Sequence, residues 1–348
     1  MDYTKQYINN SVIIEDKKKE VCVVSEQTFS SLSSLTTYKK VVDISKHHKI
    51  YGLTQNDYNE VLEKIKKQNC FLEYNYIYDK ISGTQIPLKD LVISANHNPN
   101  RYHALIQNRI NTLSNVAKEK NLSPLFMTLT LPSEFHKMKI DKKTKTLIAN
   151  PKYNHVTPKE AVKHLTKMFS KLRHDRSLKE LSKDERIYFR VNEPHKNGTP
   201  HTHVLLFVPK SSIDRVVTAF KRLFDNKAND IQTNIENATS YIMKYINKTL
   251  PLSKKENLSK KDKYLNAWYC KHRIIRFNCS RTLAPLSLYR LLHEKFNLKE
   301  LTSLVKKKSL SIFVLQTNRD KIMEIFNGDE LIYQRSENYT LRNGLLDF

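Results

Sequence analysis

The segment that decides the fold is Ile187–Pro209, which reads IYFRVNEPHKNGTPHTHVLLFVP. Two β-rich runs flank Asn197-Gly198, a dipeptide typical of tight turns between antiparallel strands. The pattern predicts one strand over Ile187–Glu193 and a second over His201–Pro209. The rest of the chain can be interpreted outward from this hairpin.

The spacing of His201 and His203 predicts that both imidazoles lie on one face, because side chains alternate along a strand. Pairing across the turn puts Glu193 opposite His201, with Cβ atoms about 5 Å apart. A histidine pair alone is more often structural, but the facing carboxylate favours a three-ligand metal site with positions open for water and phosphate. The ligand set admits Mg²⁺ or Mn²⁺, and the imidazoles favour the transition metal.

A second candidate element is Ser240–Lys248, which reads SYIMKYINK. On a helix, Tyr241, Tyr245 and Lys248 would share one stripe, while the isoleucines would share another that can bury against a sheet. We expect this helix to cover about Asn237–Leu250. The alternative interpretation is a pair of amphipathic tyrosines that pack at a sheet edge.

A phenol with a pKa of about 10 is a weak nucleophile at neutral pH. Attack on a phosphodiester therefore needs charge stabilisation, which a metal on the phosphate and a nearby ammonium can supply. Lys244 and Lys248 each follow a tyrosine by three residues, so both are candidates for that ammonium.

Three further residues are candidates for supporting contacts. His195 lies in the loop of the predicted hairpin and either supports a ligand, contacts phosphate or is an exposed loop histidine. Thr128 and Thr130 share one face of a strand predicted over Phe126–Pro132, FMTLTLP. Both threonines either contact DNA or the active site, or pack in the core.

Other elements are predicted from periodicity and caps. A helix should follow Asn98, and Thr157 with Glu160 forms a capping box that opens another. We also expect helices over Ser212–Phe224 and near Leu286–Lys299, a solvated loop over Lys254–Lys263, and two strands in the tail.

The amino-acid composition indicates which class of molecule the protein binds. The 348 residues include 60 Lys+Arg and 35 Asp+Glu, for a formal net charge of +25, which favours nucleic acid over a membrane surface. Four cysteines form no C-x-x-C pair and fit a reducing cytoplasm. We find no signal peptide, membrane span or G-x-x-x-x-G-K-[ST] motif, and we expect a cytoplasmic protein without an ATPase motor.

Three segments, in this order, resemble the motifs of HUH endonucleases: FMTLTLP, EPHKNGTPHTHVLLF and ATSYIMKYINK. The paired tyrosines in Y-x-x-x-Y make the chain more similar still to the phage replication gene A protein family. Flanking segments that also match are RYHALIQNRINTL and AWYCKHRIIRFNCSRTLAPLSLYRLLH, so the resemblance spans about residues 98–294.

The resemblance implies an α+β fold of the HUH/Rep type. Its central antiparallel sheet would have about five strands, with the histidine motif on a central strand, helices on the other face and the tyrosine helix across the metal face. The catalytic nicking and joining domain would span residues 96–295, between a basic N-terminal region (1–95) and a small C-terminal region (296–348) of unknown role.

Carried over by position, the resemblance implies that Glu193, His201 and His203 are metal ligands and that Tyr241 and Tyr245 are nucleophiles assisted by the two lysines. The implied activity is rolling-circle initiation on single-stranded origin DNA of a phage or plasmid. A tyrosine would form a 5′-phosphotyrosine bond and free a 3′-OH, then the DNA would be rejoined, and a host helicase and polymerase would cooperate.

Two positions depart from the family pattern. Thr202 stands where a hydrophobic residue is usual, and Asn197 stands where an acidic residue is usual. The main rival function is a two-tyrosine HUH transposase, which often carries an N-terminal zinc module that no cysteine cluster supports here. A non-catalytic nucleic-acid-binding protein would explain the charge but neither the metal triad nor the tyrosine pair.

Overall fold

The structure is a computed structural model that describes residues 6–8, 11–13, 24–25, 49–141, 143–144, 146–253, 257–316 and 321–344. The chain divides into two compact units, one of residues 1–48 with 137–151 and one of residues 49–136 with 152–348. The described parts of the first unit are a three-stranded sheet and a two-stranded hairpin. These are β1 (Gln6–Ile8), β2 (Ser11–Ile13) and β3 (Val24–Ser25), and β7 (Met138–Ile140) with β8 (Leu147–Ala149).

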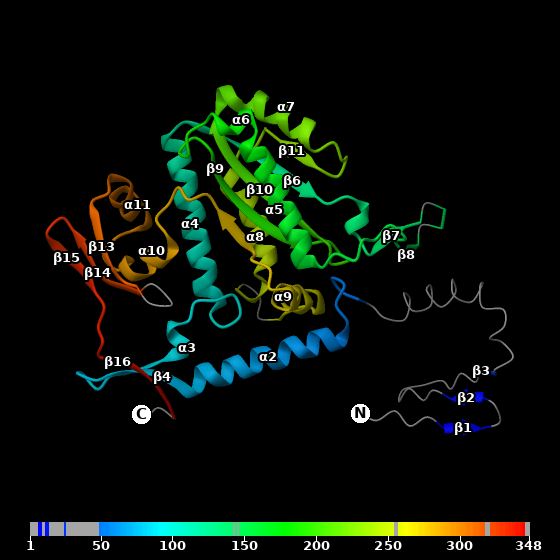
Figure 1. The fold of residues 1–348 in the computed structure, drawn as a ribbon, viewed down its shortest axis with the longest axis horizontal. Helices are drawn as coiled ribbons and strands as arrows, with labels where there is room; N and C mark the ends of the chain where they lie inside the picture. The colour runs from blue at the N-terminus through cyan, green and yellow to red at the C-terminus, as the bar shows by residue number, and fades with distance from the viewer. Residues whose placement is uncertain are drawn as a thin grey trace. The chain divides into compact units, whose positions relative to one another are not determined.

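The second unit is built on a five-stranded antiparallel sheet, which confirms the predicted fold class (Figure 1). The strand order is β11 (Asp230–Gln232), β6 (Leu122–Thr130), β10 (Pro200–Pro209), β9 (Ile187–Pro194) and β12 (Phe277–Cys279). The strand with the histidine motif is therefore the central one, and β6 and β9 flank it with long antiparallel ladders.

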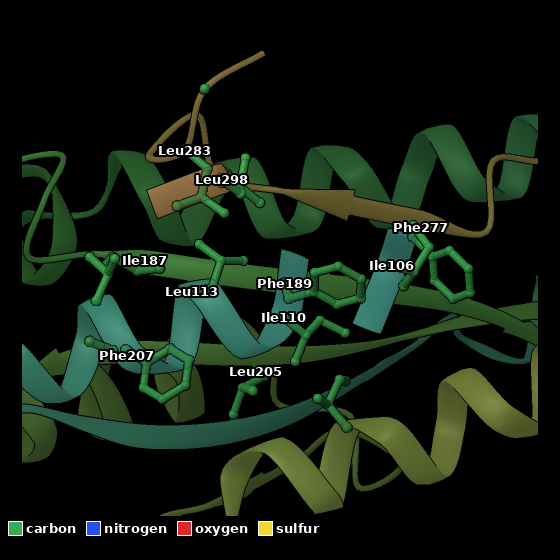
Figure 2. Close-up of a cluster of buried hydrophobic side chains, with 14 of the residues drawn as sticks. Ile106, Ile110, Leu113, Ile187, Phe189, Leu205, Phe207, Phe277, Leu283 and Leu298 are labelled. Atoms are coloured by element: carbon green, nitrogen blue, oxygen red, sulfur yellow. The ribbon is translucent and has the colours of Figure 1, made fainter. Parts of the chain in front are cut away.

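Helices cover both faces of this sheet. The tyrosine helix, α8 (Ala238–Thr249), lies on the face of the candidate metal residues, as expected, but α4 (Pro99–Glu119), α10 (Leu286–Leu292) and α11 (Leu298–Lys307) join it there, which was not expected. Figure 2 shows the shared core, in which Ile110 and Leu113 of α4 lie against Phe189, Leu205 and Phe207 of the strands. The other face packs against α5 (Pro158–His174), α6 (Arg176–Lys179) and α7 (Ile213–Leu223).

The helices begin where their capping residues predict. Asn98 accepts a hydrogen bond from the backbone of Arg101 at the start of α4, and Thr157 and Glu160 form the expected capping box of α5. Asn237 caps α8 by accepting a hydrogen bond from the backbone of Ser240. Local sequence therefore fixes the ends of the three helices that cover the sheet most directly.

A third core lies outside the sheet and was not predicted. Helix α2 (Gln55–Tyr74) packs on α9 (Lys260–His272), with Leu53 and Val61 buried against Trp268. Helix α9 begins inside the segment expected to be a solvated loop, because Ser259 and Asp262 form a capping box. The loop prediction is wrong from Lys260 onward, and residues 254–256 lie outside the described residues.

The C-terminal part is richer in structure than predicted. The single helix expected near Leu286–Lys299 is two helices, α10 and α11, and the two expected strands are four. They are β13 (Leu310–Leu315), β14 (Lys321–Asn327) and β15 (Glu330–Gln334) in one sheet, and β16 (Tyr339–Asn343), which pairs with β4 (Asn75–Asp79) beside β5 (Gln85–Pro87).

Short helical turns complete the described elements: α3 (Leu88–Leu91), η2 (Ser133–Phe135), η3 (Lys210–Ser212) and η4 (Pro251–Ser253). Among the helices that the structure describes, none combines the length and the apolar character needed to cross a bilayer.

Candidate functional site

The strand register places the predicted ligands on one face of the sheet. His201 on β10 pairs with Glu193 on β9, as the turn predicted, and His203 lies two residues farther along the same face. Thr130 and Thr128 on β6 pair with His201 and His203 respectively. The face therefore carries a carboxylate, two imidazoles and two hydroxyls contributed by three adjacent strands.

The three predicted metal ligands converge. The Nε2 atoms of His201 and His203 are 3.1 Å apart, and each lies 3.8 Å from Oε2 of Glu193. One donor atom from each residue falls within 4.8 Å of the others. All three residues are buried, with Glu193 only 1% exposed.

Two atoms of this cluster that could bind a metal make no hydrogen bond within the described residues. Among the described residues, Oε1 of Glu193 and Nδ1 of His201 are buried without a hydrogen-bond partner. Such atoms are costly unless a partner or an ion satisfies them. The donor set of one carboxylate and two imidazoles, together with these unsatisfied atoms, fits a divalent transition metal or Mg²⁺.

The electrostatic environment keeps both imidazoles neutral, as metal ligation requires. Burial, followed by the charges of Lys248 and His195, lowers the pKa of His203 to about 3. Burial and the neighbouring His203 also lower the pKa of His201 well below its ordinary value. Because both rings are uncharged at neutral pH, their 3.8 Å contacts with Glu193 are not ion pairs.

Lys248 reaches the cluster from α8. Its Nζ atom donates a hydrogen bond to Oε2 of Glu193 at 2.5 Å, while the side chain remains half-exposed. Burial raises the pKa of Glu193, and the ammonium of Lys248 opposes that shift. Of the two predicted lysines, Lys248 is therefore the one at the candidate metal site, and Lys244 is exposed.

Thr128 supports one of the candidate ligands. Its Oγ1 atom lies 3.1 Å from Nδ1 of His203, on the side of the ring away from the cluster. A proton on Nδ1 that is donated to Thr128 leaves the lone pair of Nε2 directed at the cluster. Thr130 is buried, and its backbone N–H donates a hydrogen bond to the side chain of Asn229.

His195 packs on the cluster through its ring. It stacks on His201 with ring centroids 4.2 Å apart, and on its other side His136 lies 5.4 Å away. Burial, followed by the charges of His136 and Lys248, lowers the pKa of His195 to about 4. His195 is thus a partly buried neighbour of a candidate ligand, and the exposed-loop alternative does not hold.

The two tyrosines are both half-buried and contact different strands of the sheet. The ring of Tyr245 is 4.0 Å from the ring of His203, whereas Tyr241 donates a hydrogen bond of 3.0 Å to Gln232 on β11. Burial raises the pKa of Tyr245, and the neighbouring Tyr241 and Glu193 raise it further. Ile242 and Ile246 on the opposite stripe of α8 are fully buried, as predicted.

Both departures from the family pattern have structural explanations. Thr202 points to the opposite face, where its hydroxyl donates to the side chain of Asn192 at 2.7 Å. Asn197 stabilises the turn by accepting a hydrogen bond from the backbone N–H of Thr199. Neither residue takes a position in the candidate metal cluster.

Sequence reasoning missed two residues that position the tyrosines. Phe126 packs edge-on against Tyr241, stacks on Tyr245 and lies 5.5 Å from the ring of His203. It shares a face of β6 with Thr128, so strand alternation could have identified it. Gln232 could not be identified, because β11 has only three residues and carries no periodic pattern.

Comparisons with known proteins converge on one family. The model of the bacteriophage replication gene A protein (GPA) family matches residues 35–252. The replication protein of Haemophilus phage HP1 is 32% identical over 184 residues, which cover 48% of this chain and 22% of that protein. The replication gene A protein of Escherichia phage 186 is 27% identical over 227 residues, covering 60% of this chain and 31% of that protein.

A probable replication endonuclease from a prophage-like region of Salmonella typhi is 26% identical over 248 residues, covering 63% of this chain and 30% of that protein. The chain thus spans between 22% and 31% of the length of these three relatives. No solved structure matches the chain.

Proposed function

Because this chain belongs to the bacteriophage replication gene A protein family, we propose that it starts rolling-circle replication by nicking one DNA strand with a tyrosine nucleophile. The observation that carries the proposal is the position of α8, which packs Tyr245 against His203 of the Glu193–His201–His203 cluster and keeps the ring of Tyr241 5.9 Å from that of Tyr245. The chemistry is that of an HUH endonuclease, and the catalytic segment is residues 96–295.

The proposed reaction exchanges one phosphodiester for another. The phenol oxygen of a tyrosine bonds to the scissile phosphorus, and the bond from phosphorus to the 3′ oxygen breaks. The phenol loses its proton and the departing 3′ oxygen gains one, so the products are a 5′-phosphotyrosine and a free 3′-OH. Attack of a 3′-OH on the phosphotyrosine reverses the exchange: it rejoins the DNA and releases the phenol. The second tyrosine can cleave the strand once more and so supply that 3′-OH.

The residues divide the work by position. Glu193, His201 and His203 would hold Mg²⁺ or Mn²⁺, which supplies positive charge to a non-bridging phosphate oxygen when bound. Lys248 adds an ammonium beside Glu193, and Lys244 lies one turn earlier on α8. Each ammonium can stabilise the negative charge that develops on the phosphate. That help is needed because burial raises the pKa of Tyr245 above its ordinary value.

The proposed substrate is single-stranded or extruded origin DNA of a phage or plasmid, with a host helicase and polymerase acting after the nick. The replication names of the relatives support this role over transposition. The chain's net charge of +25 supports a polyanionic substrate.

The test is covalent capture. Incubation with Mn²⁺ and end-labelled single-stranded origin DNA should give an adduct that survives SDS. Tyr241→Phe and Tyr245→Phe should each retain some adduct, with the larger loss in Tyr245→Phe because Tyr245 lies against His203. The double variant should give none.

Tyr289→Phe is the matched control, since this tyrosine lies on α10 and its hydroxyl accepts a hydrogen bond from Asn108. Adduct formation by the double variant, or its loss in Tyr289→Phe, would contradict a nucleophilic role for the pair on α8.

A further inference from the structure

On the side of the sheet opposite the metal cluster, two arginines have no counter-charge among the described residues. Arg190 on β9 lies three residues before Glu193, so alternation turns its side chain to the opposite face. There its guanidinium carbon lies 5.1 Å from the ring centroid of Phe169 on α5. Arg173, also on α5, lies 5.6 Å from the same centroid.

Both guanidinium groups lack polar partners within the part of the chain that the structure describes. The Nε atoms of Arg173 and Arg190 are buried and make no hydrogen bond. Arg190 is 8% exposed, and no described carboxylate pairs with it. Burial lowers the pKa of Arg190, the neighbouring Tyr188 opposes that shift, and the positive charge of Arg173 adds to it.

Other arginines of the same unit do have polar partners. Arg186 donates to the carbonyls of Arg173 and Leu178, and Arg276 donates to the carbonyl of Thr249 and the side chain of Asn266. A cation–π contact with one aromatic ring stabilises a guanidinium only weakly and does not replace a counter-charge. Two adjacent like charges, one of them buried, therefore need an anion.

We propose that Arg173 and Arg190 form a second phosphate-binding subsite, whose ligand is a backbone phosphate of the single-stranded DNA substrate. Guanidinium groups suit this ligand, because their forked N–H donors match phosphate oxygens. The subsite shares its DNA ligand with the proposed function but needs neither metal nor tyrosine.

The topology lets one DNA strand reach both faces. Arg190 pairs with Asn278 on β12, which is the edge strand of the sheet. Glu193 lies about 10 Å farther along β9, at about 3.3 Å per residue. A strand of DNA that passes around the β12 edge can therefore contact the subsite and the metal cluster together.

The first experiment tests anion binding with inorganic phosphate. In EDTA, phosphate should raise the thermal midpoint of the wild-type protein above that in chloride of equal ionic strength. Arg190→Met should remove this difference in thermal midpoint. Arg173→Met should remove most of it. Because Arg173 is only half-buried, this second variant keeps the test usable if Arg190→Met fails to fold. Arg215→Met is the control, because Arg215 already pairs with Glu180.

The second experiment identifies the ligand as DNA. Binding of a single-stranded oligonucleotide is measured against salt in EDTA, in a Tyr241→Phe/Tyr245→Phe background that cannot cleave. Each arginine replaced should lower the slope of log affinity against log salt by about 0.7, and Arg215→Met should not. An unchanged slope in Arg173→Met overturns the DNA assignment, including a case in which phosphate alone still stabilises the protein. Neither result depends on nicking, so failure here is distinct from failure of the covalent-capture test.

Discussion

At the scale of single residues, Thr128 is expected to fix the orientation of the His203 ring, so that Nε2 faces the candidate metal ligands. The hydrogen bond to Nδ1 of His203 orients the ring, and loss of such a bond typically weakens metal affinity on the order of tenfold or more. Thr128→Val should therefore raise the Kd for Mn²⁺ in a calorimetric titration by that factor. Thr130→Val is the matched control, since no described contact joins its side chain to His201. Equal Kd values for the two variants would contradict a role for Thr128 in metal binding.

The neutral imidazoles also predict how the metal-free protein responds to acid. His203 has an ordinary pKa of 6.5 when unfolded and about 3 when folded, so its contribution to stability is full above pH 6.5. That contribution falls by about 1.4 kcal/mol per pH unit as pH drops below this value, because only the unfolded state takes up the proton. Chemical denaturation between pH 6.5 and 4.5 should show a shallower dependence on pH in His203→Gln than in wild type. A parallel dependence in both proteins would mean that His203 is protonated when folded.

At the scale of elements, the turn before β10 depends on a close approach of two backbones. A Cβ atom on Gly198, at φ +88°, would lie 2.3 Å from the carbonyl oxygen of Tyr51. Gly198→Ala should therefore lower the free energy of unfolding by about 3 kcal/mol or more, as measured by chemical denaturation. Gly83→Ala is the control, because Gly83 has φ +70° with nothing within 4 Å of its Cβ position. Similar losses in both variants would show that the close approach is unimportant.

The same scale shows what sequence can and cannot predict. The pairing of His201 with Glu193 was predictable because one tight turn fixes the register of both strands. Edge strand β11 was not predictable, because its three residues pair only with β6, which is distant in sequence. Helix α9 was missed because the lysines before it suggested a loop, although Ser259 and Asp262 carried a capping signal. The sheet face of Arg190 was predictable from alternation, but its lack of a partner depends on how α5 packs.

At the scale of the whole molecule, the core between the sheet and helices α4 and α8 extends beyond the proposed boundary at residue 295. Leu298, Leu301, Ile325 and Ile332 are buried in the same cluster as Ile110. Each contributes about 1.5–3 kcal/mol by burial, and the sum rivals the stability of a typical domain. A fragment of residues 96–295 should therefore lack a cooperative thermal transition by circular dichroism, while a fragment of residues 49–344 should keep one. A sharp transition in the shorter fragment near that of the full chain would show that the C-terminal elements are dispensable.

The spacing of the two tyrosines has a consequence for how a replication cycle would proceed. Their ring centroids are 5.9 Å apart, close to the pitch of about 5.4 Å of the helix that carries both. That helix is anchored by fully buried isoleucines on its other stripe. Because one cluster would activate the phosphate for both phenols, transfer of the reaction from one to the other would then require each phenol to swing in turn toward the same phosphate while the helix stays still. The rate of such a handover would depend on rotation about the single bonds of the two side chains, and not on a rearrangement of the protein backbone.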